Sequence, residues 1–421
     1  MDTPSSLGRT IRTAGLLASL LVLSGCAAAP NATAPSAAPA PSPTASAASD
    51  GHGVDGGSAS EVSSPASALI IGDENGGITL LDLATETRES LRAGEGDADS
   101  IQSDGRFVYV THADRAAVDV IDTARWTVPH GDHTHSFRGE PRLVGTLAGD
   151  GDLVVTAGEQ RAALQFPGEF LVISHEELAH EELTPEADAL AEIERRPSDA
   201  TGPIVPFADH LLIPTADTSI EIADADGAPL SGEGMPCTDV TDADVTRVGV
   251  VFACAEGAVL FTREVGGAVV GESIPTPHGA PAPTQLSGRA DRPDLAGIAG
   301  DRGAWLLDVR ARAWTLLPSD VPLVAAVAIG DDESRTIVLD SEGRVRILDP
   351  TGEVLVRTEP LLAASVADPS TRERVRLIVD AQHVYVSDPA SGAVYELDHR
   401  DSLHITRTFA DLDPWFLQLV G

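Results

Sequence analysis

Short hairpins of β-strands repeat along most of this chain. From about residue 67 onward, apolar runs rich in β-branched residues alternate with turns rich in Gly, Asp and Asn. The stretch "ALIIGDENGGITLLDLATE" is one example, with an apolar run, a turn built on Asn75-Gly76-Gly77 and a second apolar run. The stretches "TIVLDSEGRVRILDPTGE" and "HVYVSDPASGAVYELDHRD" have the same form. Each predicts two antiparallel strands joined by a tight turn.

These hairpins recur roughly every 40 to 50 residues, and no long helical pattern lies between them. Such spacing indicates an all-β fold, a single β-propeller over residues 67–421, and this length predicts seven or eight blades at about 40 to 45 residues each. The final stretch "DPWFLQLVG" is expected to pair with the first blade and close the ring, because an open ring exposes sheet edges. Two stacked β-sandwiches are the alternative, but no Pro- or Ser-rich break divides the region.

The first 26 residues resemble a bacterial lipoprotein signal peptide. Arg9 and Arg12 precede the apolar run "AGLLASLLVL", which is too short to span a bilayer. The run ends in "LSGC", which resembles a lipobox and predicts a lipid on Cys26. An ordinary signal peptide that ends near a cysteine is the alternative.

Residues 27–66 are mostly Ala, Pro, Ser, Thr and Gly, a composition typical of a disordered linker. We therefore expect a protein anchored by its N-terminal lipid to the extracytoplasmic face of the cell membrane. The net charge is −37, which argues against nucleic acid as a partner because phosphate binding needs a basic surface. We expect a monomer.

Two cysteines remain after Cys26. In an exported protein, Cys237 and Cys254 most simply form a disulfide. Closing the loop between them would stabilise the fold by about 3 kcal/mol in the chain-entropy model.

Three histidines gather in the stretch "VPHGDHTHSFRGEP", which we interpret as a long loop between two strands. His130, His133 and His135 lie within six positions, with Asp132 among them, in a chain that has only 12 histidines. Imidazole is a common ligand of Zn²⁺, and alternate residues of an extended segment point to the same side. His133 and His135 can therefore share one metal ion, with His130 as a third ligand. Asp132 either returns in a turn or orients an imidazole.

Histidine elsewhere in the chain could complete this site. We rank His112 first, because it ends a predicted strand just before the loop and could face the mouth of the channel. The motif predicts Zn²⁺ but leaves other divalent ions such as Cu²⁺ and Ni²⁺ as competitors. The alternative is a polar loop whose histidines bind no metal.

A second insertion, residues 174–196, is rich in Glu, Leu and Ala. It predicts a surface helix capped by Ser174, without a function that we can derive.

The signal peptide, the propeller length and "HGDHTHSF" together resemble the AztD-type zinc metallochaperones. That resemblance implies delivery of zinc to the solute-binding protein of a zinc ABC importer. Only His130, Asp132, His133 and His135 match a diagnostic motif of the family. The chain departs from the family by having a single histidine, His52, in the linker, and none in "CTDVTDADV" or "PRLVGTLAGDG". Asp239 and Asp242 are candidates to replace the missing ligands.

We therefore expect a zinc-binding metallochaperone. The alternative is a surface-tethered propeller that serves as an interaction scaffold without a metal role. An enzyme is not expected, because the sequence lacks a GxSxG elbow, an HExxH motif and a convincing EF-type calcium loop.

Overall fold

A computed structural model describes residues 59–94, 96, 98–130, 133–149, 151–179, 190, 193–230, 232 and 234–421. The expected signal peptide with Cys26, and the linker as far as residue 58, lie outside this part of the chain. Among the described residues, no helix is long and apolar enough to cross a membrane.

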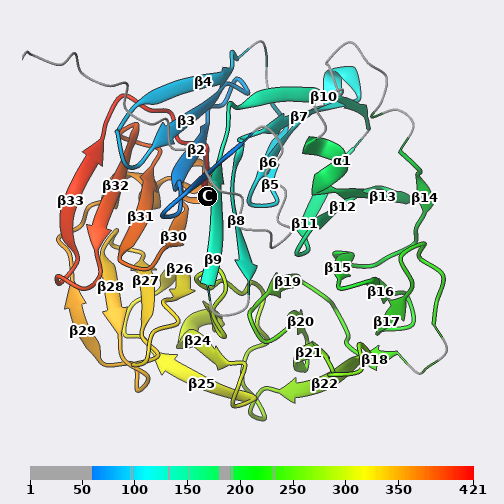
Figure 1. Cartoon of the computed structure of the whole chain (residues 1–421). Helices are drawn as coiled ribbons and strands as arrows, with labels where there is room; N and C mark the ends of the chain where they lie inside the picture. Colours follow the sequence, from blue (N-terminus) through cyan, green and yellow to red (C-terminus); the bar gives the residue numbers. More distant parts are fainter. Residues whose placement is uncertain are drawn as a thin grey trace, which may run out of the picture. The chain divides into compact units, whose positions relative to one another are not determined.

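The described strands form nine antiparallel sheets, of which eight are the blades of a propeller (Figure 1). The strands of each blade are named from the channel outward. The first blade contains β34 (Phe416–Val420), β2 (Ala68–Gly72), β3 (Ile78–Asp82) and β4 (Arg88–Arg92), and the second contains β5 (Ser100–Ser103), β6 (Phe107–His112), β7 (Ala117–Asp122) and β10 (Arg142–Ala148). The third contains β11 (Val154–Ala157), β12 (Arg161–Phe166), β13 (Glu169–Ser174) and β14 (Arg196–Pro197), and the fourth contains β15 (Val205–Phe207), β16 (His210–Thr215), β17 (Ser219–Ala223) and β18 (Met235–Pro236).

The last four blades follow the same order. The fifth blade contains β19 (Asp242–Val245), β20 (Val250–Cys254), β21 (Gly257–Arg263) and β22 (Val269–Pro275), and the sixth contains β23 (Asp294–Ile298), β24 (Gly303–Asp308) and β25 (Ala313–Pro318). The seventh contains β26 (Leu323–Ala328), β27 (Thr336–Asp340), β28 (Val345–Leu348) and β29 (Val354–Arg357), and the eighth contains β30 (Leu377–Val379), β31 (His383–Asp388), β32 (Ala393–Asp398) and β33 (His404–Phe409). In the sixth blade, a bridge between Ser287 and Ala296 takes the place of a regular inner strand.

Buried apolar clusters lie between neighbouring blades all the way around the ring. One cluster packs Ile70 of the first blade against Val108 of the second, and others continue in order to the eighth blade. The last cluster joins Tyr385 of the eighth blade to Leu69 and Leu417 of the first. The propeller prediction is confirmed with eight blades, and the two-sandwich alternative is wrong.

The ring closes by strand pairing as well as by packing. The C-terminal strand β34 pairs with β2 along its whole length, from Gly72 opposite Phe416 to Ala68 opposite Val420. The predicted role of "DPWFLQLVG" is therefore confirmed, and the first blade contains both a strand from the start of the domain and its last strand.

Aspartates at the ends of strands set the tight turns. The carboxylate of Asp73 accepts hydrogen bonds from the amides of Asn75 and Gly77, both at 2.8 Å. Gly76 has a φ of +75°, which glycine adopts without strain. The same pattern of bonds to the second and fourth following amides recurs at Asp224, Asp340 and Asp349. These turns explain the Asp and Gly punctuation of the sequence.

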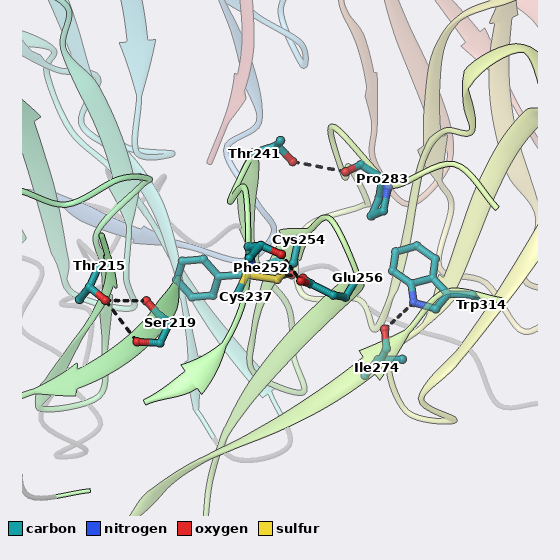
Figure 2. The surroundings of a disulfide bond; sticks show 11 residues. Thr215, Ser219, Cys237, Thr241, Phe252, Cys254, Glu256, Ile274, Pro283 and Trp314 are labelled. Atoms are coloured by element: carbon teal, nitrogen blue, oxygen red, sulfur yellow. Dashed lines mark hydrogen bonds between the residues drawn. A yellow bond between two sulfur atoms is a disulfide. The ribbon is translucent and has the colours of Figure 1, made fainter. Parts of the chain in front are cut away.

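The predicted disulfide between Cys237 and Cys254 is present, with Cα atoms 5.3 Å apart (Figure 2). Cys237 follows the fourth blade and Cys254 ends β20 of the fifth, so the bond joins neighbouring blades. Both cysteines are buried, in a cluster that includes Phe252.

The helix predicted over residues 174–196 is wrong at its C-terminal end. Helix α1 spans His175–Ala179, and Ser174 caps it as expected, with its hydroxyl accepting a hydrogen bond from the amide of Glu177. Arg196 instead pairs with Phe170 as part of β14, because the outer edge of β13 offers backbone partners. Two further short helices are α2 (Ala363–Ala367) and α3 (Pro369–Arg372).

Within the described residues, regular structure also begins before residue 67. Strand β1 (Ser60–Val62) pairs with β9 (His133–Arg138), which in turn pairs with β8 (Arg125–His130) in the ninth sheet. The linker prediction is therefore wrong for these three residues. Their composition is linker-like, but the free edge of β9 supplies backbone hydrogen bonds that composition cannot show.

Shortening one side chain of the closing strand should weaken the whole ring. Leu417 is 2% exposed, so Leu417→Ala is expected to lower the free energy of unfolding by about 2 to 4 kcal/mol. Gln418→Ala, at the next position of the same strand, should change it by less than about 1 kcal/mol. Urea unfolding of both variants measures the difference, and equal losses would contradict the role assigned to this packing.

Candidate metal site

The histidine stretch is a β-hairpin, not the long loop expected from the sequence. It follows β7 of the second blade and precedes β10, and in Figure 1 it lies over the middle of the ring. Residues His130 and His133 are cross-strand partners at its tip. Asp132 and the side chains of His130 and His133 lie outside what the structure describes.

The register of the hairpin still places the histidine positions. Directly opposite positions of an antiparallel pair share a face, and so do alternate positions along one strand. Since His130 is opposite His133, and His135 is two residues further along, all three positions belong to one face of the hairpin.

On that face, His135 contacts a carboxylate from the N-terminal strand. Its Nδ1 lies 2.7 Å from Oε1 of Glu61, which belongs to β1. The imidazole is 13% exposed and the carboxylate 57%. A carboxylate on one ring nitrogen fixes the orientation of an imidazole, as it does for histidines that bind metals. Sequence reasoning missed Glu61, because its neighbours have the composition of a linker.

The base of the hairpin is attached to the first blade by a buried carboxylate. Cross-strand partners Arg125 and Arg138 both lie near Oδ2 of Asp82, at 2.9 and 3.0 Å. Burial opposes the charge on Asp82, but hydrogen bonds from Thr85 and the charges of the two arginines together lower the pKa of its carboxyl. Asp82 therefore carries a negative charge that binds both strands of the hairpin.

An aromatic pair lies on the same face as His135, nearer the base. Trp126 and Phe137 are stacked with their ring centroids 5.1 Å apart. The guanidinium of Arg106 lies 3.6 Å from the centroid of Trp126, and it also donates two hydrogen bonds to Asp122 at the end of β7. The second blade thus supports the hairpin from this face, while Asp82 of the first blade holds the other.

His112 lies in a different environment from the one predicted. Its Nε2 is 3.1 Å from Asp119, whose carboxylate also accepts hydrogen bonds from Arg92 and Thr146 on the outer strands β4 and β10. Burial lowers the pKa of His112; the charge of Asp119 opposes this shift, and the charges of Arg115 and Arg92 add to it. The residue belongs to a buried polar network between the first two blades. The expectation that it faces the channel mouth is therefore wrong.

Two aspartates alternate on β19, the inner strand of the fifth blade. Oδ2 of Asp242 accepts a hydrogen bond of 2.7 Å from the amide of Leu286. Burial raises the pKa of Asp242, and burial together with the charge of Asp242 raises the pKa of Asp244 to about 7. Asp239 precedes this strand and is exposed. Within the described ranges, no three His, Cys, Asp or Glu residues are arranged to hold a metal ion.

Among the comparisons with known proteins, the one with solved structures finds matches and supports the fold. No protein-family model matches the chain, and no curated protein matches its sequence. The solved structure of apo AztD from Citrobacter koseri matches it at 20% identity with a TM-score of 0.67, covering 85% of this chain and 98% of that one. A second structure of Citrobacter koseri AztD gives a TM-score of 0.66 at the same identity and coverage. The chain therefore has an AztD-like propeller fold.

The raised pKa of Asp244 predicts how stability depends on pH. The folded chain holds this proton more tightly than the unfolded chain, so the free energy of unfolding falls as the pH rises from about 4 to 7. We expect Asp244→Asn to be more stable than the wild type at pH 8 by about 2 kcal/mol, less than the full linkage value because the side chain is only half-buried.

Urea unfolding at pH 4.5 and pH 8 measures this gain, which should be small at the lower pH. Asp239→Asn, at an exposed position of the same region, is the control and should gain nothing at either pH. The same gain at both pH values would contradict the assignment.

Proposed function

We propose that this protein is an extracytoplasmic zinc metallochaperone whose metal site is the histidine face of the β8–β9 hairpin. One observation carries the proposal: the contact between His135 and Glu61, on the face that the register assigns to positions 130, 133 and 135. A carboxylate that orients an imidazole beside two further histidine positions is an arrangement suited to zinc. The AztD-like fold supports the same function.

In this proposal His130, His133 and His135 supply imidazole ligands, and Asp132 or a water molecule completes a tetrahedral shell. Zn²⁺ is the cargo of the protein. A shell built from one hairpin and an exchangeable ligand suits a protein that passes its metal on, whereas four fixed protein ligands would retain it. Other divalent transition metals would compete for the same imidazoles.

The partner that we propose is the solute-binding protein of a zinc ABC importer. A lipid on Cys26 would hold the chain, as a monomer, on the extracytoplasmic face of the cell membrane, where such a partner is within reach of the linker. The protein would act by binding and transfer, not as an enzyme.

A surface-tethered scaffold lipoprotein without a metal role is the alternative. A propeller rim binds other proteins in many families, and the fold does not choose between these functions. The two proposals differ in whether the histidines are needed for metal binding.

Isothermal titration calorimetry, with Zn²⁺ titrated into the purified full-length protein, tests the proposal. We expect a His130/His133/His135 triple Ala variant to lose tight binding. Glu61→Gln should weaken binding by about 10- to 100-fold, because the imidazole of His135 loses its anionic partner. Glu89→Gln, which removes one exposed carboxylate from β4, is the matched control and should bind as the wild type does.

Binding should also weaken below about pH 6.5, because imidazole must be neutral to bind a metal ion. Zinc affinity that is the same at pH 7.5 and pH 5, or that survives in the triple variant, would refute the metal site and favour the scaffold.

A further inference from the structure

A second polar site lies at one end of the propeller channel. A cavity of about 240 Å³ opens among the eighth, first and second blades. Its lining consists of Asp73, Glu74, Ala98, Asp99, Ser100, Ile101, Arg374, Arg376, Trp415 and Phe416. These residues come from the starts of the inner strands β5, β30 and β34 and from the turn between β2 and β3.

This cavity is at the opposite end of the first blade from the base of the histidine hairpin. Asp73 begins the turn that joins β2 to β3, whereas Asp82, which binds Arg125 and Arg138, is the last residue of β3. A strand of five residues separates the two ends. The cavity is therefore distinct from the candidate metal site.

Two arginines form one wall of the cavity. The guanidinium of Arg374 lies over the ring of Trp415, 3.9 Å from its centroid. Arg376 donates hydrogen bonds to the backbone carbonyls of Glu373 and Val375. Neither arginine forms an ion pair within 4 Å with a described carboxylate. Burial and the neighbouring charge of Arg374 lower the pKa of Arg376, so an anionic group placed here would relieve an unfavourable charge.

Carboxylates form the other side. Asp73 and Glu74 come from the turn after β2 of the first blade and Asp99 from the start of the second, whereas the two arginines precede β30 of the eighth. The nearby Asp413 has a raised pKa, caused by burial and then by the charges of Glu74 and Asp73. A cation would therefore be favoured on this side, as an anion is on the other.

We propose that this cavity binds a zwitterionic small molecule of the α-amino acid class. Its carboxylate would accept hydrogen bonds from Arg374 and Arg376, and its ammonium group would face the acidic side formed by Glu74 and its neighbours. A ligand that carries only a negative or only a positive charge would be attracted by one wall and repelled by the other. The volume is below the roughly 300 Å³ at which pockets for drug-sized ligands begin, which suits a single amino acid. This site does not depend on the proposed metal function.

Calorimetric titration of the full-length protein with a panel of free L-amino acids tests the proposal. N-acetyl-L-alanine, which keeps only the carboxylate, and L-alanine methyl ester, which keeps only the ammonium group, are the matched probes. We expect at least one amino acid to bind with a Kd in the micromolar to low millimolar range, and at least tenfold more tightly than either blocked probe.

The binding should weaken at least tenfold in the double variant Arg374→Gln/Arg376→Gln and also in Glu74→Gln. Arg357→Gln removes the same charge from an exposed position on β29 and should bind as the wild type does. Three results would overturn the proposal: no binding across the panel, equal binding of a blocked probe, or binding that persists in both cavity variants. Arg374, Arg376 and Glu74 lie outside the buried apolar core, so these substitutions should leave the fold intact, which circular dichroism checks.

Discussion

The pairing of β34 with β2 is the interaction on which the rest of this structure depends. It joins the last strand of the chain to the first strand of the ring, and the cluster of Leu69, Leu417 and Tyr385 packs behind it. The blade that results supports both candidate sites. Its strand β3 ends in Asp82, which holds the histidine hairpin, and its strand β34 is preceded by Trp415, which lines the cavity at the other end. Loss of closure would therefore disturb both sites together.

Electrostatic pairing then gives the two sites different properties. At the base of the hairpin, one buried carboxylate forms ion pairs with two arginines, so that the hairpin is fixed to the ring. In the cavity, Arg374 and Arg376 form one side and carboxylates form the other, and neither arginine forms an ion pair within 4 Å with a described carboxylate. In a chain with a net charge of −37, cations that lack a carboxylate partner inside a cavity are the unusual feature. The ion pairs of Asp82 hold the histidine hairpin in place, whereas the arginines of the cavity remain able to bind an anionic group of a ligand.

Much of the fold could be predicted because it rests on local chemistry. Aspartate and glycine turns such as the one at Asp73 are visible in the sequence, and so are the closing strand and the disulfide of Cys237 and Cys254. The site was less predictable, because it depends on contacts between distant segments. Glu61 reaches His135 across more than 70 residues, and nothing in its neighbourhood signals a strand. The buried network that His112 forms with Asp119 and Arg92 could not be predicted either, because its members come from different strands.

Zinc K-edge X-ray absorption on the zinc-loaded full-length protein tests the central claim most directly, since it counts the imidazoles around the metal. The account predicts a four-coordinate shell with at least two imidazole nitrogens at about 2.0 to 2.1 Å, and their loss in the His130/His133/His135 triple Ala variant. A shell made only of oxygen ligands, or one unchanged in that variant, would place the metal elsewhere and contradict the account.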